Sequence, residues 1–175
     1  GCGKGNDIPY LAKKFKDGVG LDISSTTLKS LSKKLVDKNI PNITLIEGNV
    51  VDLPFKDNKF DFVFSIGVIH HNSYEMIKTA LSEIRRVLKR GGVLILKVAS
   101  IHNYYHRKGK KIADFTYLSD IKGHPHVCHY FFSKERLKNI LEGFDAVYIE
   151  EIKKLDVVTN RFIPAGHIIA IVRRK

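Results

Sequence analysis

The chain opens on Gly1-Cys2-Gly3-Lys4-Gly5, and Gly20-Leu21-Asp22-Ile23-Ser24 follows one short segment later. Glycines let a backbone turn tightly and approach a ligand without a Cβ clash. An acidic residue at the end of the next strand can accept hydrogen bonds from ribose hydroxyls. A dinucleotide fingerprint needs a further glycine where this chain has Asn6. The pattern therefore predicts a nucleoside site in an α/β sheet, and a plain turn with a helix cap is the alternative.

Strand and helix patterns alternate along the rest of the chain, which predicts a parallel sheet with helical crossovers. The expected strands cover residues 19–23, 43–46, 60–66 and 93–98, and the expected helices cover 7–15 and begin near residues 25, 73 and 133. Residues 60–66 are almost wholly apolar, as a strand buried on both faces should be. Residues 146–152 and 167–172 predict a terminal antiparallel pair.

Composition limits the class of protein. The 175 residues, 43% of them hydrophobic, predict a single domain over residues 1–175. No apolar run is long enough for a membrane span, no signal peptide is visible, and the 2 cysteines are typical of a reducing, cytoplasmic setting. A net charge of +12 favours polyanionic partners, RNA first, although a basic surface without a specific partner is the alternative.

Three segments carry a resemblance to a known family. The glycine loop has the spacing G-x-G-x-G, residues 48–55 read GNVVDLPF before FDFV at 60–63, and residues 85–95 read RRVLKRGGVLI. Together they resemble the class I S-adenosylmethionine-dependent methyltransferases of the type 11 subgroup, with Arg90 in place of the family's proline. The resemblance covers residues 1–99. It implies a Rossmann-like, doubly wound, mostly parallel sheet with an antiparallel C-terminal strand, and S-adenosylmethionine as the cofactor.

The resemblance also implies roles for the opening residues. Gly1, Gly3 and Gly5 would wrap the methionine part of the cofactor, Asp22 would bind the ribose hydroxyls, and Ile23 would lie against the adenine. In this fold the central strand precedes the glycine loop, so we expect residues upstream of Gly1 that supply this first strand.

Two further pairs of residues would complete the cofactor site. Asn49 stands where the family usually has aspartate, and its amide oxygen can accept the same hydrogen bond from the adenine amino group. Val50 would offer its backbone N–H to the adenine ring. Ser65 and Ile66, at the carboxyl end of their strand, would border the reactive methyl group, because ligands of such sheets lie outside that edge.

The segment after that strand holds the candidate catalytic residues. Gly67-Val68-Ile69-His70-His71-Asn72 is not the Asp/Asn-Pro-Pro-Tyr/Phe signature of amino-group methylation, and no cysteine is placed for the covalent adduct of cytosine C5 enzymes. His70 or His71 could act as a general base for an oxygen or activated carbon nucleophile. The alternative is that one imidazole packs or caps while the other faces water. A carboxylate acceptor would need no base.

Residues 100–132 interrupt the strand–helix rhythm and are interpreted as a basic, aromatic lid over the substrate site. Aromatic side chains that stack on bases, beside cations that follow phosphates, are typical of single-stranded RNA binding. The candidate substrate-binding residues are Tyr104, Tyr105, Arg107, Lys108, Lys110 and Lys111. A solvated loop is the alternative.

One histidine-rich stretch of the lid raises the question of a metal. In an extended segment His124, His126 and Cys128 would share one face, and imidazole with thiolate suits zinc. No second ligand cluster is evident in the sequence, so we expect no metal site.

We therefore predict an S-adenosylmethionine-dependent methyltransferase that acts on RNA, with tRNA as the expected partner and an oxygen or carboxylate as acceptor. The closest type that the resemblance suggests is the wobble-uridine carboxymethyl tRNA methyltransferases. A methyltransferase of quinones, lipid precursors or other small-molecule substrates is one alternative. A non-catalytic RNA-binding or scaffold subunit with the same fold is another, and a protein partner subunit is left open.

Overall fold

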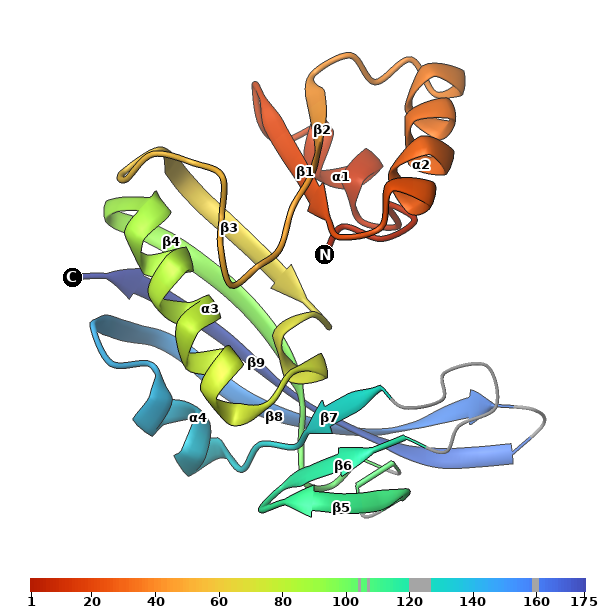
Figure 1. Cartoon of the computed structure of the whole chain (residues 1–175), viewed down its shortest axis with the longest axis vertical. Helices are drawn as coiled ribbons and strands as arrows, with labels where there is room; N and C mark the ends of the chain where they lie inside the picture. The colour runs from red at the N-terminus through yellow and green to blue at the C-terminus, as the bar shows by residue number, and fades with distance from the viewer. Residues whose placement is uncertain (104, 107, 120–126, 159–160) are drawn as a thin grey trace. The chain divides into compact units, whose positions relative to one another are not determined.

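The computed structural model describes residues 1–103, 105–106, 108–119, 127–158 and 161–175 of the chain. These residues form two compact units, Gly1–Pro54 and Phe55–Lys175. Figure 1 shows the first unit in red and orange and the second in yellow to blue. Each unit contains a parallel strand pair joined through a helix, which is the crossover that the alternating sequence pattern predicted.

The first unit consists of α1 (Ile8–Ala12), β1 (Gly18–Asp22), α2 (Ser25–Asp37) and β2 (Ile43–Glu47). The register of the parallel pair runs from Gly18 opposite Ile43 to Asp22 opposite Glu47. Helix α2 begins after Ser24, whose Oγ accepts a hydrogen bond from the Thr27 N–H at 3.2 Å. The predicted apolar face of this helix is confirmed, because the leucines at 28, 31 and 35 are all buried.

Helix α1 is shorter than predicted. The sequence predicted a helix over residues 7–15, whereas the observed helix ends at Ala12. The Asn42 side-chain amide donates to the carbonyls of Ala12 at 2.9 Å and Phe15 at 3.0 Å, so it satisfies groups that a longer helix would have bonded internally.

The second unit holds a four-stranded sheet in the order β3-β4-β9-β8. Its elements are β3 (Phe60–Ile66), η1 (Ile69–His71), α3 (Tyr74–Val87), β4 (Leu88–Ala99), α4 (Lys134–Ile140), β8 (Phe144–Val158) and β9 (Arg161–Arg174). Strand β3 is parallel to β4, while β9 runs antiparallel to both β4 and β8. Helices α3 and α4 pack against β4 and β8 respectively. The predicted apolar face of α3 forms part of the core, with Ile77, Leu81 and Ile84 buried.

Two predictions about these strands were wrong. Strand β3 is not buried on both faces, because Phe62 is 44% and Ile66 38% exposed. Among the described strands β3 pairs only with β4, so it lies at the edge of its sheet. Strand β4 begins at Leu88 rather than at residue 93, since α3 ends one residue earlier and Leu88 already pairs with Phe60.

Within residues 100–132, interpreted above as a lid, the described residues include a small separate sheet. It has the order β5-β6-β7, with β5 (Lys110–Ala113), β6 (Thr116–Leu118) and β7 (Cys128–Tyr130) all antiparallel. Tyr117 and Phe131 pack with Ala99 at the end of β4, which joins this sheet to the core of the second unit.

The architecture confirms the predicted α/β fold class, a Rossmann-like arrangement of parallel strands with an antiparallel C-terminal pair. The antiparallel pair was predicted, although β8 and β9 extend well beyond residues 146–152 and 167–172. The upstream first strand stays a prediction. Among the described strands, β1 pairs only with β2 and β3 only with β4.

Candidate functional site

The glycine loop of the first unit has the backbone that its sequence predicted. Gly3 and Gly5 both have positive φ, +52° and +65°, in the region that favours glycine. The Cys2 N–H donates to the Leu21 carbonyl at 2.7 Å, which fixes Gly1 and the rest of the loop beside β1. A Cβ on Gly3 would meet nothing within 4 Å, so its backbone borders open space that a ligand can enter.

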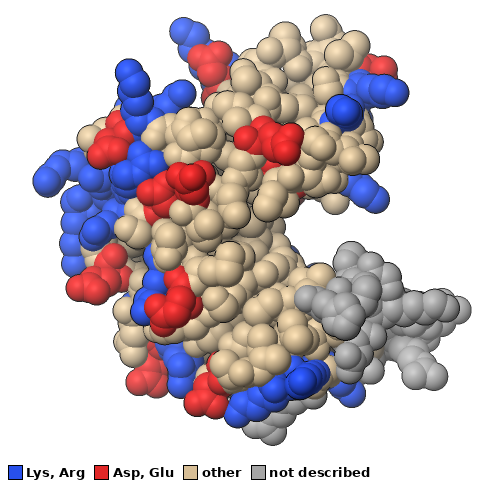
Figure 2. Space-filling view, viewed as in Figure 1, with Lys and Arg blue, Asp and Glu red and all other residues tan. Residues whose placement is uncertain are grey.

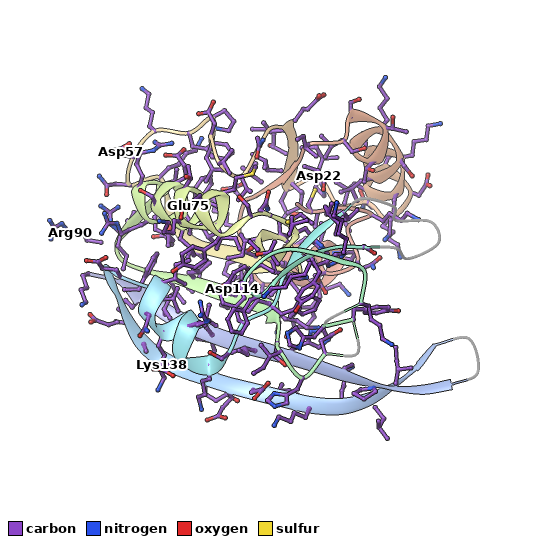
Figure 3. The ribbon with its side chains drawn as sticks, turned by 60° about the horizontal axis from the view of Figure 1, so that its bottom comes forward. Asp22, Asp57, Glu75, Arg90, Asp114 and Lys138 are labelled. Atoms are coloured by element: carbon purple, nitrogen blue, oxygen red, sulfur yellow. The ribbon has the colours of Figure 1, made fainter. Side chains whose placement is uncertain are left out.

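Asp22, labelled in Figure 3, ends β1, and its carboxylate is hydrogen-bonded to this loop. Its Oδ2 accepts a hydrogen bond from the Gly3 N–H at 2.7 Å, and its Oδ1 accepts one from the Ser24 N–H at 3.0 Å. Each carboxylate oxygen keeps a further lone pair, so the group can also accept two ribose hydroxyls. The neighbouring Ile23 is 69% exposed, which leaves an apolar surface beside the carboxylate for an adenine ring.

Asn49 and Val50 lie in a turn directly after β2. The Asn49 Oδ1 accepts a hydrogen bond from the Val51 N–H at 3.2 Å, and the Asn49 carbonyl accepts one from the Asp52 N–H at 3.2 Å. The amide oxygen therefore shapes its own turn and retains one lone pair for an adenine amino group.

In the second unit, Ser65 and Ile66 end β3. Ser65 is only 4% exposed, and its Oγ has no hydrogen-bond partner among the described residues. Most buried polar groups are paired, so an unpaired hydroxyl at a strand's carboxyl end indicates a place where a ligand completes the site. In the first unit, the open space at Gly3 and the spare lone pairs of Asp22 fit the methionine and ribose parts of S-adenosylmethionine.

Three histidines come together beside the end of β3. His70 and His71 lie on η1, and His129 is the central residue of β7, which packs against η1. The ring centroids of His70 and His71 are 4.2 Å apart, and those of His71 and His129 are 4.7 Å apart. One ring nitrogen of each histidine lies within 4.8 Å of the others.

The environment of His70 determines its protonation. The residue is 8% exposed, and its Nδ1 has no hydrogen-bond partner among the described residues. Burial holds the pKa of His70 well below 6.5, and the nearby charges of His71, His129, His167 and Lys97 lower it further. His70 is therefore neutral at pH 7. His71, in contrast, is exposed.

The predicted substrate-binding residues divide into three groups. Tyr104 and Arg107 lie outside the described residues. Tyr105 packs on the Ala99–Tyr117–Phe131 cluster, so its ring is partly buried against the core. The side chains of Lys108 and Lys110 are exposed, whereas Lys111 pairs with Asp114 at 2.9 Å in the β5–β6 hairpin.

Of the three metal ligands considered in the histidine-rich stretch, only Cys128 is among the described residues. His124 and His126 lie outside the described residues. Burial raises the pKa of the Cys128 thiol, so this residue is a poor source of thiolate at neutral pH. His129, which the sequence did not single out, joins His70 and His71 instead. No sequence signal connects them, because β7 and η1 are far apart along the chain.

The comparisons with known proteins identify the family of the chain. Residues 1–96 match the family described as "Methyltransferase domain". The chain belongs to the methyltransferase domain family. The predicted S-adenosylmethionine-dependent methyltransferase class and its cofactor, S-adenosylmethionine, are thereby confirmed.

Two curated relatives are similar to part of this chain. A demethylmenaquinone methyltransferase of Staphylococcus carnosus is 44% identical over 77 residues, which are 44% of this chain and 30% of the relative. A fatty-acid O-methyltransferase of Mycolicibacterium smegmatis is 33% identical over 97 residues, 54% of this chain and 34% of the relative. The chain thus spans about a third of the length of these two relatives.

Solved structures support the fold of this methyltransferase domain over its whole length. A Methanosarcina mazei S-adenosylmethionine-dependent methyltransferase has a TM-score of 0.81 at 20% identity, and the match covers 99% of this chain and 89% of that one. A Haloferax volcanii methyltransferase in complex with its activator has a TM-score of 0.77 at 18% identity, covering 99% and 79%. Among the described helices, none combines the length and hydrophobicity needed to cross a bilayer.

Proposed function

We propose that this methyltransferase transfers a methyl group from S-adenosylmethionine to an oxygen or carboxylate acceptor on RNA, with tRNA as the substrate class. Methyl transfer is supported foremost by the hydrogen bond that ties the Gly3 N–H to the Asp22 carboxylate at 2.7 Å. This bond holds the glycine loop and the ribose-binding acid in one rigid arrangement before any ligand arrives. Such preorganisation is how binding sites avoid the entropic cost of ordering.

Residues of the first unit would bind different parts of S-adenosylmethionine. Gly1, Gly3 and Gly5 would enclose the methionine part. Asp22 would accept from the ribose hydroxyls, with Ile23 against the adenine. These roles follow from the open space at Gly3 and the exposure of Ile23. When bound, S-adenosylmethionine supplies a methyl group already activated on sulfonium sulfur.

The remaining cofactor contacts would come from Asn49, Val50, Ser65 and Ile66. Asn49 and Val50 would meet the adenine edge from the turn after β2. The Ser65 hydroxyl, unpaired within the described residues, would hydrogen-bond near the reactive methyl group.

His70 and His71 would orient the acceptor. The buried His70 is neutral, because its lowered pKa makes it a weak base, so we assign it positioning rather than proton removal. The exposed His71 can reach an acceptor oxygen directly. A carboxylate acceptor is already a nucleophile, so orientation alone would suffice for its methylation.

RNA as the acceptor is supported by charge and by aromatic surface. The net charge is +12. Figure 2 shows Lys and Arg gathered over the end of the second unit where α3 meets β4, with Asp and Glu among them. Several of these cations are paired: Arg86 with Asp57 at 2.8 Å and Lys89 with Asp61 at 2.8 Å. We assign phosphate contacts to Lys108 and Lys110, whose side chains are exposed just before and at the start of β5.

A hollow of about 510 Å³ in the second unit adds stacking groups. Its lining includes the rings of Tyr74 and Phe115 and the guanidinium of Arg136, which lies 3.9 Å over the Phe115 ring centroid. Aromatic and guanidinium planes are the groups on which unpaired bases stack.

A small-molecule acceptor is the second candidate. The relatives named as demethylmenaquinone and fatty-acid O-methyltransferases favour it, although the matches cover only 44% and 54% of this chain. A protein activator, as in the Haloferax volcanii complex, is a further partner that this methyltransferase would accept under either candidate.

The test is transfer of isotope-labelled methyl from S-adenosylmethionine, with total tRNA and a total lipid extract in parallel reactions. We expect label in tRNA, lost in Asp22→Ala, and nucleoside digestion would then give the acceptor. Label only in the lipid fraction would establish the second candidate. Cofactor binding without label in either fraction would contradict both.

The lysines provide a sharper test of RNA contact. Changing Lys108 and Lys110 together to Ala should lower the slope of log affinity against log salt by about 0.7 per lysine for a single-stranded substrate. Lys29→Ala with Lys33→Ala, on the exposed face of α2, is the matched control and should leave the slope unchanged. Equal slopes for the two double variants would remove these lysines from the RNA site.

A further inference from the structure

We propose that His70, His71 and His129 form a binding site for a divalent transition-metal ion of the zinc type. One ring nitrogen of each residue lies within 4.8 Å of the others, and all three belong to the second unit. The site does not depend on the proposed methyl transfer, because it is built from these rings alone.

The spacing of the three nitrogens is close to that of a bound ion. Zinc–nitrogen bonds of about 2.0–2.1 Å in a tetrahedral site place the ligand nitrogens about 3.4 Å apart. The observed limit of 4.8 Å therefore requires movements on the order of 1 Å. His71 is exposed, so rotation of its side chain can supply most of that movement without disturbing the core.

Two rigid elements hold the ligands. His70 and His71 follow Ile69, which is fully buried at 0% exposure, and the Asn72 side chain donates to the Ile69 carbonyl at 3.2 Å. His129 pairs with Tyr117 in the small sheet, and it directly precedes Tyr130, which is 1% exposed. Metal sites are most exact when their ligands stand on such fixed backbone.

An independent observation points into this cluster. The Nδ1 of His70 is buried without a hydrogen-bond partner among the described residues, and the residue is 8% exposed. A buried polar nitrogen without a partner is energetically costly, and a bound ligand would remove that cost.

The ligand set indicates which ion fits. Imidazole suits zinc, copper, nickel and iron rather than magnesium or calcium, which prefer oxygen. Three imidazoles leave one tetrahedral position open, and such sites hold an exchangeable oxygen ligand. The nearby Lys97 ammonium and His167 oppose a cation, so we expect weaker binding than in a closed four-ligand site.

The test is direct metal binding by the tag-free full chain in the absence of S-adenosylmethionine. After treatment with a chelator, the protein is titrated with Co²⁺, followed by its visible absorption, and with Zn²⁺ in competition with a chromophoric chelator. We expect one equivalent bound, a tetrahedral cobalt spectrum, and at least 100-fold weaker binding in His71→Ala. His71 is exposed, so this variant should fold normally.

Two further variants complete the comparison. His129→Ala should lose affinity as His71→Ala does, with circular dichroism as the check on folding. His102→Ala is the matched control, because His102 is exposed, pairs with Glu151 at 2.6 Å and lies outside the cluster. The proposal is overturned if the wild type binds no stoichiometric metal, or if His71→Ala and His102→Ala bind equally. Metal binding without methyl transfer would contradict the proposed function alone.

Discussion

The glycine loop of the first unit and the end of β3 in the second unit differ in whether their polar side chains have hydrogen-bond partners among the described residues. In the first, both carboxylate oxygens of Asp22 already accept backbone N–H groups, so the site is organised by its own chain. In the second, Ser65 Oγ and His70 Nδ1 are buried without partners among the described residues. The difference teaches that the first unit's polar groups already have a structural role, whereas we infer that those of the second unit are available to a ligand.

The strongest test of this difference is Asp22→Ala, which should damage both structure and binding. The variant removes the partners of two backbone N–H groups and the acceptor of the ribose hydroxyls. Because each hydrogen bond to a charged group contributes about 1.5–3 kcal/mol, affinity for S-adenosylmethionine should fall at least about 100-fold. Isothermal titration calorimetry measures this directly.

Glu47→Ala is its matched control. Glu47 ends β2 directly opposite Asp22 in the parallel register, and its carboxylate is exposed, whereas Asp22 is half-buried. We expect little change in its cofactor affinity. If both variants weakened binding equally, a general charge effect rather than the Asp22 site would be responsible.

Two glycines in the loop should separate folding from binding. In Gly5→Ala the new Cβ would lie 2.3 Å from Leu31 Cδ1, at a φ of +65°, so the free energy of unfolding should fall by about 2–4 kcal/mol. In Gly3→Ala the Cβ enters open space at a φ of +52°, and the backbone cost should be about 1–2 kcal/mol. Urea unfolding measures both.

The affinity for the cofactor should give a second comparison of these glycine variants. Gly3→Ala fills the space that the methionine part would enter, so we expect at least a tenfold loss of affinity in a protein that remains folded. A folded Gly3→Ala variant with wild-type affinity would show that the cofactor does not approach this glycine.

Ser65→Ala should have the smallest effect on stability. Its hydroxyl has no partner to lose within the described residues, so the free energy of unfolding should change by less than about 0.5 kcal/mol. Methyl transfer should nevertheless fall. The matched control is Ser133→Ala, which removes the 3.2 Å bond to the Arg136 N–H at the start of α4 and should cost about 1 kcal/mol. A Ser65→Ala variant that lost stability to the same degree would mean that this hydroxyl is structural.

The sequence predicted the positive-φ glycine loop and the strand that ends at Asp22, because the determinants of both are close together in the chain. The Gly3–Asp22 contact joins a loop to the adjacent strand, and glycine spacing with one acid is enough to indicate it. The spacing of Ile77, Leu81 and Ile84 likewise predicted which face of α3 is buried in the core.

The second unit's site depends on tertiary contacts, which no local pattern contains. His129 reaches η1 only because residues 110–130 fold into a small sheet that packs on the end of β4. The exposure of Phe62 likewise depends on which strands lie beside β3, and apolar composition alone could not reveal that.

The packing of β7 against η1 also affects the kinetics of folding. His71 and His129 are distant in sequence, so their contact closes a long loop, and such contacts form late because the entropy of closure must be overcome first. A partly folded chain could already hold the local glycine loop while the imidazole cluster is still unformed. An ion bound across the three rings would then act as a cross-link, slowing unfolding of the second unit while leaving its rate of folding nearly unchanged.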